Sequence, residues 1–209
     1  MNEAEAHLRG ADPVLGALID RLAGQVETIE VRRERRPADY YAGLVRTIVG
    51  QQLSTRVAQT IWLRVLDYFE GALPTPAMIL AAEPEELRAA AGLSRAKTSY
   101  LRSLAEHVES GALELEHLEQ LDDQTVISEL VAVKGLGEWS AHMFLMFQLG
   151  RPDVLAPGDL GIRRGIQIAY GLEEMPAPRE VIERAEQWRP FRTTACIYLW
   201  GAIDARPAA

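Results

Sequence analysis

Residues 130–141 (LVAVKGLGEWSA) place two glycines, one residue apart, between two segments in which apolar residues recur at helical spacing. Gly135 and Gly137 allow the backbone to take positive φ angles and to approach a ligand closely. Because a second helix is expected directly after Gly137, its free N–H groups point out of the turn. The segment therefore predicts a helix–turn–helix hairpin that can bind one phosphate group. Alternatively, the glycines serve only the packing of an ordinary turn between two helices.

The rest of the chain also has a helical pattern. Apolar residues recur every three or four positions through residues 39–68, and turn residues separate further segments of this kind as far as residue 203. Only residues 26–32 (VETIEVR) alternate apolar and polar side chains as a strand does. We therefore expect an all-α fold of two helical lobes, with the hairpin motif and an active-site cleft between the lobes.

The expected organisation along the chain has three parts. Residues 1–38 form an N-terminal segment that packs on the C-terminal lobe. Residues 39–129 form a helical lobe with an exposed turn near residue 52, and residues 130–209 form the lobe that contains the hairpin.

Composition excludes several classes of protein. With 209 residues, 48% hydrophobic and 25% charged, the chain has an ordinary globular composition rather than that of a disordered protein. No apolar run reaches the roughly 18 residues of a membrane span, and the N-terminus lacks the apolar region of a signal peptide, so we expect a cytoplasmic protein. The single cysteine, Cys196, excludes an internal disulfide, a four-cysteine iron–sulfur cluster and a cysteine-built zinc site.

Net charge is −8, which argues at first against a nucleic acid as partner. However, residues 83–129 hold 11 acidic and 4 basic side chains, so nearly all of the acidic excess lies there. A basic face elsewhere on the protein is therefore compatible with the composition. The chain has only two lysines, Lys97 and Lys134, which restricts any chemistry that needs a Schiff base.

Four further segments, together with the hairpin, carry a resemblance to a known family. They are residues 48–54 (IVGQQLS), 92–101 (GLSRAKTSYL), 153–159 (DVLAPGD), and 188–192 (WRPFR) followed by Ala195 and Trp200. Over residues 40–203 the chain resembles the helix-hairpin-helix (HhH-GPD) superfamily of DNA glycosylases, and its alkylbase (3-methyladenine DNA glycosylase II) branch most closely. The resemblance implies a compact form without the N-terminal β-rich domain of larger relatives.

The resemblance implies an activity. The expected protein is a monofunctional DNA glycosylase that flips an alkylated purine, such as 3-methyladenine or 7-methylguanine, out of duplex DNA. It hydrolyses the N-glycosidic bond and leaves an abasic site for base excision repair. The implied partner is double-stranded DNA, the implied state is a monomer, and no cofactor is required.

The resemblance places the catalytic aspartate of the family at Asp159. A carboxylate that faces the sugar stabilises the positive charge that develops there as the glycosidic bond breaks. Alternatively, Asp159 only caps the helix that is expected from Leu160 onward. Asp153 is the competing acid, but it lies before the loop turns. In relatives that also cleave the strand, a lysine lies two residues after the second hairpin glycine, and Trp139 occupies that position here.

The expected base pocket is lined by Trp139, Trp200, Met143 and Phe191. Alkylated purines of this type are cationic, and a cation over an indole gains roughly 0.5–2 kcal/mol. Alternatively, these side chains belong to the core.

The resemblance also assigns DNA contacts. A wedge that fills the gap left by the flipped base is expected at residues Gln51, Gln52 and Leu53, with Gln52 or Leu53 the best candidates. The alternative is a simple cap between two helices. Further DNA-binding residues are expected at Gly135, Leu136, Gly137, Ser94, Lys97 and Arg163. A Na⁺ or K⁺ ion held by the backbone carbonyls of Val131, Val133 and Leu136 is also implied by the resemblance, and no side chain reveals it.

Two other functions remain open on the sequence. The first is a helix-hairpin-helix protein that binds damaged DNA without cutting it, and the second is a glycosylase for deaminated or mismatched bases. Asp159 argues against the first, because binding anionic DNA gains nothing from an acid that faces it.

Overall fold

The structure is a computed structural model that describes residues 2–27 and 39–205. These residues form helices and turns, with no strand among them, so the prediction of an all-α fold is confirmed. Residues 26–32, which alternate apolar and polar side chains, fall almost wholly outside the described residues. No helix in the described part of the chain is long and apolar enough to cross a membrane.

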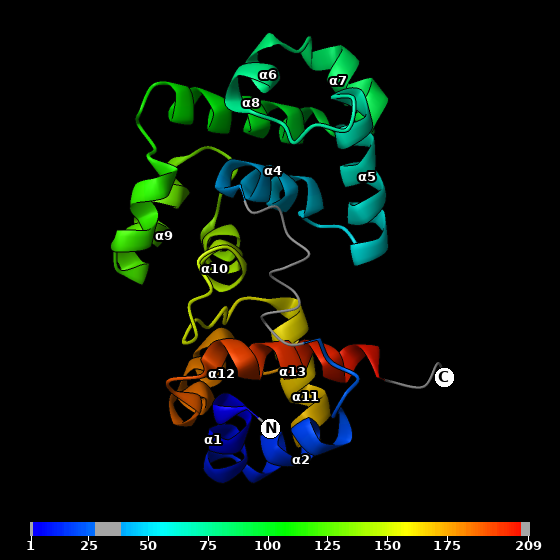
Figure 1. Cartoon of the computed structure of the whole chain (residues 1–209). Coiled ribbons are helices and arrows are strands. Elements are labelled where there is room, and N and C mark those ends of the chain that lie inside the picture. Colours follow the sequence, from blue (N-terminus) through cyan, green and yellow to red (C-terminus); the bar gives the residue numbers. More distant parts are fainter. Residues whose placement is uncertain (1, 28–38, 206–209) are drawn as a thin grey trace. The chain divides into compact units, whose positions relative to one another are not determined.

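The described residues divide into two compact units (Figure 1). We call residues 39–149 the hairpin unit, and residues 2–27 with 150–205 the aspartate unit. The helices of the hairpin unit are α4 (Tyr40–Gly50), α5 (Thr55–Tyr68), α6 (Pro76–Ala81), α7 (Pro84–Ala91), α8 (Arg95–Glu109), η1 (Leu115–Gln120), α9 (Asp123–Ala132) and α10 (Glu138–Phe147). Those of the aspartate unit are α1 (Glu3–Ala11), α2 (Pro13–Arg21), α11 (Leu160–Tyr170), α12 (Pro178–Ala185), η2 (Glu186–Trp188) and α13 (Arg192–Asp204).

This division differs from the one expected at residue 129. The two hairpin helices, α9 and α10, pack against each other, and α10 also packs against α4, so the hairpin belongs with the helices that precede it. The N-terminal helices α1 and α2 pack with α13, and α2 also contacts α11.

Helix α4 forms the core of the hairpin unit. It is apolar on nearly all sides, and its side chains Leu44, Val45 and Ile48 are fully buried. Gly43 allows the end of α10 to approach, because a Cβ atom at this position would lie 2.2 Å from Nε2 of Gln148. The burial of α4 places its C-terminus, and the turn that follows, at a defined position in the unit.

In the aspartate unit, α11 crosses α13 at close range (Figure 1). Gly165 makes this possible, since a Cβ atom there would lie 2.3 Å from the carbonyl oxygen of Leu199. Ile162 and Ile166 are buried on the same side of α11. The close crossing fixes the N-terminus of α11, where Asp159 is the cap.

Asp12 joins the N-terminal helices to the rest of the aspartate unit. It is 3% exposed, and its Oδ1 accepts hydrogen bonds from the backbone amides of Val14 and Leu15 and so caps α2. Its Oδ2 accepts hydrogen bonds from Nε1 of Trp188 at 2.8 Å and from the hydroxyl of Tyr170. Burial by itself raises the pKa of Asp12, but these hydrogen bonds outweigh it, and the pKa lies below its usual value.

Candidate functional site

The hairpin turn comprises residues 133–137, between α9 and α10. Gly135 has φ +94°, and a Cβ atom at this position would lie 2.1 Å from Cγ of Tyr100 on α8. Glycine is therefore required at residue 135 both by the backbone conformation and by the contact with Tyr100. Gly137 differs, because it has φ −112° and no atom lies within 4 Å of its Cβ position. At the N-cap of α10, Gly137 leaves open space in front of the free N–H groups of the helix.

Replacing Gly135 with alanine is expected to lower the free energy of unfolding by about 2–4 kcal/mol, because the new Cβ strains the backbone and overlaps the ring of Tyr100. Gly137→Ala is the matched control, two residues away in the same turn. It is expected to cost no more than about 1 kcal/mol, the usual effect of alanine at an N-cap. Urea unfolding of both variants checks the prediction, and equal losses would contradict it.

The wedge turn comprises residues 51–53, between α4 and α5. Gln52 has φ +57°, a left-handed conformation that costs a residue other than glycine about 1–2 kcal/mol. Gln52 is exposed, and Leu53 is 36% exposed. Ser54 accepts a hydrogen bond from the amide of Val57 and caps α5, so the turn also has the capping role given above as its alternative. The two exposed side chains are the ones available for contact with DNA.

Gln51 has a different environment from its two neighbours. Its Nε2 donates to the carbonyl oxygen of Gly135 at 2.8 Å and to Oγ of Ser140 at 3.1 Å. Ser140 is 2% exposed, so this bond lies inside the unit. Gln51 thus connects the wedge turn to the hairpin turn, and its contact with DNA stays a prediction.

A pocket of about 240 Å³ opens beside the wedge turn within the hairpin unit. Leu53, Trp139 and Met143 line it, so the two expected pocket residues of α10 share one cavity with the wedge turn. Trp139 is 39% exposed, whereas Met143 is buried. Arg46 and Gln59 also line the pocket, and Nη2 of Arg46 donates to Oε1 of Gln59 at 3.1 Å. Neither residue belongs to a sequence motif, so their place in the pocket was not predicted.

Asp159 is held by two donors in the aspartate unit. Its Oδ1 accepts hydrogen bonds from the amide of Ile162 at 2.8 Å and from Nε1 of Trp200 at 2.9 Å. The helix cap given above as the alternative role is therefore present, and it orients the carboxylate. Gly161 makes room for the indole, since a Cβ atom there would lie 2.7 Å from Cδ1 of Trp200. Trp200, expected in the base pocket, thus contacts the candidate catalytic acid directly.

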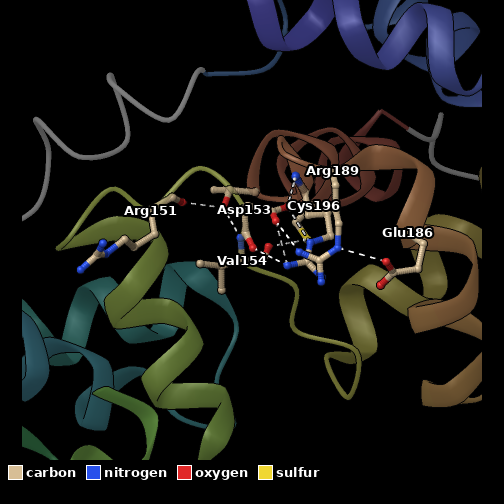
Figure 2. A network of polar contacts seen from close by, with 8 residues as sticks. Arg151, Asp153, Val154, Glu186, Arg189 and Cys196 are labelled. Atoms are coloured by element: carbon tan, nitrogen blue, oxygen red, sulfur yellow. Dashed lines mark hydrogen bonds and ion pairs between the residues drawn. The ribbon is translucent and has the colours of Figure 1, made fainter. Parts of the chain in front are cut away.

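The loop that leads to Asp159 is fixed by a polar network around Asp153 (Figure 2). The carboxylate of Asp153 accepts hydrogen bonds from Nε of Arg192 at 2.6 Å and from Nη1 of Arg189 at 2.7 Å. Oγ1 of Thr193 donates to the carbonyl oxygen of Arg151 and accepts from the amide of Val154. Asp153, the competing acid, therefore forms ion pairs that hold this loop against the start of α13.

The remaining candidate residues have partners within the protein. Ser94 caps α8 through the amide of Lys97, as its position predicts. Nζ of Lys97 donates to the carbonyl oxygen of Val49, and Nε of Arg163 donates to that of Pro176, each at 2.8 Å. The ring of Phe191 packs edge-on against His7 of α1. Sequence patterns did not indicate these three contacts.

Comparison with known proteins identifies the family. Residues 45–190 match the model of the HhH-GPD superfamily of base excision DNA repair proteins. The chain belongs to this family. DNA-3-methyladenine glycosylase 1 of Schizosaccharomyces pombe is 34% identical over 202 residues, which cover 96% of this chain and 86% of that protein. DNA-3-methyladenine glycosylase of Saccharomyces cerevisiae is 36% identical, with 97% and 71% covered.

Two solved structures are similar to nearly the whole chain. The 3-methyladenine DNA glycosylase Mag1 of S. pombe, in complex with abasic DNA, has a TM-score of 0.87 at 33% identity. The match covers 95% of this chain and 95% of that one. DNA-3-methyladenine glycosidase of Bacillus halodurans has a TM-score of 0.78 at 39% identity, with 98% of this chain and 90% of that one covered.

The monovalent cation of the HhH-GPD resemblance stays a prediction. The carbonyl oxygen of Val133 accepts the amide of Leu136, whereas those of Val131 and Leu136 accept no hydrogen bond within the described part of the chain. Carbonyl oxygens of this kind fit Na⁺ or K⁺, which would add positive charge beside a bound phosphate. Among the described residues, no cluster of histidine, cysteine or acidic side chains forms a metal site.

Proposed function

We propose that the protein is a monofunctional DNA glycosylase that hydrolyses the N-glycosidic bond of alkylated purines, of the 3-methyladenine and 7-methylguanine type, in duplex DNA. The observation that carries the proposal is the carboxylate of Asp159, oriented by Ile162 and Trp200 at the position that matches the catalytic aspartate of the family. The names of the relatives support alkylated purines as substrates, and the abasic DNA bound to Mag1 supports an abasic product.

The proposed chemistry needs one carboxylate. As the bond between C1′ and the base lengthens, its electron pair leaves with the base and positive charge builds up on the sugar. The charge of Asp159 stabilises this transition state and orients the water that adds to C1′ and loses a proton. An alkylated purine that is already cationic leaves as a neutral base and needs no acid to protonate it.

The pocket of the hairpin unit suits such a base. Trp139 presents an indole to it, and Met143 adds a polarisable thioether. No acidic side chain or histidine is present among the residues that line this pocket, all of which are described. The pocket therefore favours a base that leaves without protonation.

The product is an abasic site rather than a broken strand. A lyase step needs an amine that forms a Schiff base with the sugar, and Trp139 occupies the position where the family carries that lysine. Of the two lysines, Lys97 donates to the carbonyl oxygen of Val49, and Lys134 is an exposed residue of the hairpin turn. We propose a monomer that acts on double-stranded DNA in the cytoplasm, associated with the nucleoid if the protein is bacterial.

The function is tested by incubating the protein with methylated duplex DNA and separating the released bases by chromatography. We expect free 3-methyladenine and 7-methylguanine. Parallel duplexes carry uracil, hypoxanthine or a mismatch. Release of these bases alone would replace the proposal by a glycosylase for deaminated or mismatched bases. Binding of damaged duplex without release of any base would replace it by a damage-binding protein.

A further inference from the structure

Lys97 holds the end of the helix that leads into the wedge turn. The last carbonyl groups of α4 have no partner within the helix and need other donors. The carbonyl oxygen of Ile48 accepts the amide of Gln51, and that of Gly50 accepts the amide of Leu53. The carbonyl oxygen of Val49, between them, accepts Nζ of Lys97 at 2.8 Å. The ammonium group therefore closes the C-terminus of α4, where a positive charge is also favoured by the helix dipole.

The same face of α8 also supports the hairpin turn. Tyr100 lies three residues after Lys97, so both side chains are on one side of the helix. The ring of Tyr100 fills the space in front of Gly135, where a Cβ atom would lie 2.1 Å from Cγ of Tyr100. One helix face thus contacts both the end of α4, just before the wedge turn, and the hairpin turn.

A third contact joins the two turns directly. Nε2 of Gln51 donates to the carbonyl oxygen of Gly135 and to Oγ of Ser140. Gln52, the next residue, is held in a left-handed conformation, which persists only where the surrounding structure determines it. The start of the wedge turn is therefore held by two contacts, one from Lys97 to the preceding carbonyl of Val49 and one from Gln51 to the hairpin turn.

We propose that Lys97 is a positioning residue that fixes the wedge turn at a set distance from the phosphate-binding hairpin, so that Leu53 enters the duplex when the hairpin binds the backbone. Lys97 contacts neither the base nor the phosphate. The inference rests on the proposed function, because the wedge and the hairpin must act on the same DNA.

The proposal separates two steps of the reaction. Loss of the Lys97 contact leaves the hairpin and Asp159 in place but loosens the turn that carries Leu53. The rate then falls where the lesion must first be extracted from a paired duplex. It is spared where the lesion is already unpaired, because extraction from the stack costs less there.

The test compares Lys97→Met, which keeps the length of the side chain and removes its charge, with Lys97→Arg. Single-turnover release of 7-methylguanine is measured from a duplex with cytosine opposite and from one with a mismatched base opposite. We expect Lys97→Met to be about tenfold slower on the paired duplex and less than about threefold slower on the mismatched one. Lys97→Arg is expected to recover most of the loss.

A second readout does not depend on catalysis. An abasic duplex carries 2-aminopurine next to the abasic site, and its fluorescence rises when a wedge unstacks it. We expect the rise at saturating Lys97→Met to be less than half that of the wild type, with a similar binding midpoint. Arg102→Met is the matched control, because Arg102 is another cation of α8 that donates to a carbonyl at a helix end, that of Leu80 in α6.

The outcomes separate the inference from the proposed function. A wild-type protein that releases no base overturns the proposed function, while the fluorescence readout still tests the positioning role. Equal losses of Lys97→Met on paired and mismatched duplexes, or a fluorescence rise equal to that of the wild type, overturn the positioning role. A wild-type protein that binds no abasic duplex overturns both.

Discussion

Replacing Asp159 with asparagine is expected to slow base release by about a hundredfold to a thousandfold under single-turnover conditions, the size of effect seen when one electrostatic stabiliser of a transition state is lost. The variant keeps the size of the side chain, and its amide oxygen still accepts the bonds from Ile162 and Trp200. Only the charge is lost, so the helix cap and the fold are retained. Binding to abasic duplex is expected to be unchanged or tighter, because a negative charge has been removed.

Asp153→Asn is the control for this prediction. Asp153 pairs with Arg189 and Arg192 and does not meet the reacting sugar in the proposed chemistry. Its replacement is expected to lower thermal stability and to leave most of the rate at saturation. The assignment would move to Asp153 if Asp153→Asn, folded normally, lost base release while Asp159→Asn retained it.

Asp12→Asn is expected to lower the free energy of unfolding by about 2–4 kcal/mol, among the larger effects of a single substitution. Asp12 is 3% exposed, and the oxygen that faces Trp188 and Tyr170 would be replaced by a donor in one orientation of the amide. The other orientation loses the cap of α2. Either way, buried polar groups lose a partner.

The pH dependence of stability checks the same residue. Because the pKa of Asp12 is lowered in the folded protein, its contribution is fully present above the unfolded value of about 3.9 and is lost as the pH falls through the folded value. The wild type should therefore lose more stability below about pH 4 than Asp12→Asn does. Asp20→Asn is the control, since Asp20 is an exposed residue of α2 whose ion pair with Arg9 is expected to contribute about 1 kcal/mol or less. Equal losses from the two variants in urea unfolding would contradict the prediction.

Local features of the fold were predictable from the sequence. Ser54, Ser94 and Asp159 are typical N-cap residues, and each caps the helix that follows it, while Gly135 turns the chain between the hairpin helices. These features depend on neighbouring residues, whose propensities and hydrogen bonds lie within one turn of the chain.

Contacts between distant residues were not predictable. Lys97 meets Val49 across 48 residues, and Gln51 meets Gly135 across 84. In the sequence, a polar side chain near a helix start is compatible both with a DNA contact and with a hydrogen bond inside the protein. The packing of α8 beside α4 gives Lys97 its internal partner. For this reason Lys97, Gln51 and Arg163 were expected at the DNA, and the structure gives each of them a partner within the protein.

The domain boundary was misplaced for a related reason. The hairpin and the catalytic aspartate were expected in one lobe, so the division was expected at residue 129. The hairpin helices instead bury apolar side chains such as Phe144 and Met143, and α10 packs against α4. A helix belongs to the unit against which its apolar side chains are buried, and only the three-dimensional structure shows which unit that is.

The central claim is tested most directly with a duplex that carries a single 7-methylguanine, incubated with the protein and separated on a denaturing gel before and after treatment with alkali. The account predicts an intact strand before alkali and a break at the lesion after it, with no break above background for Asp159→Asn. A strand broken without alkali would contradict the monofunctional mechanism. A strand that stays intact in alkali, while the protein binds the duplex, would contradict the glycosylase itself.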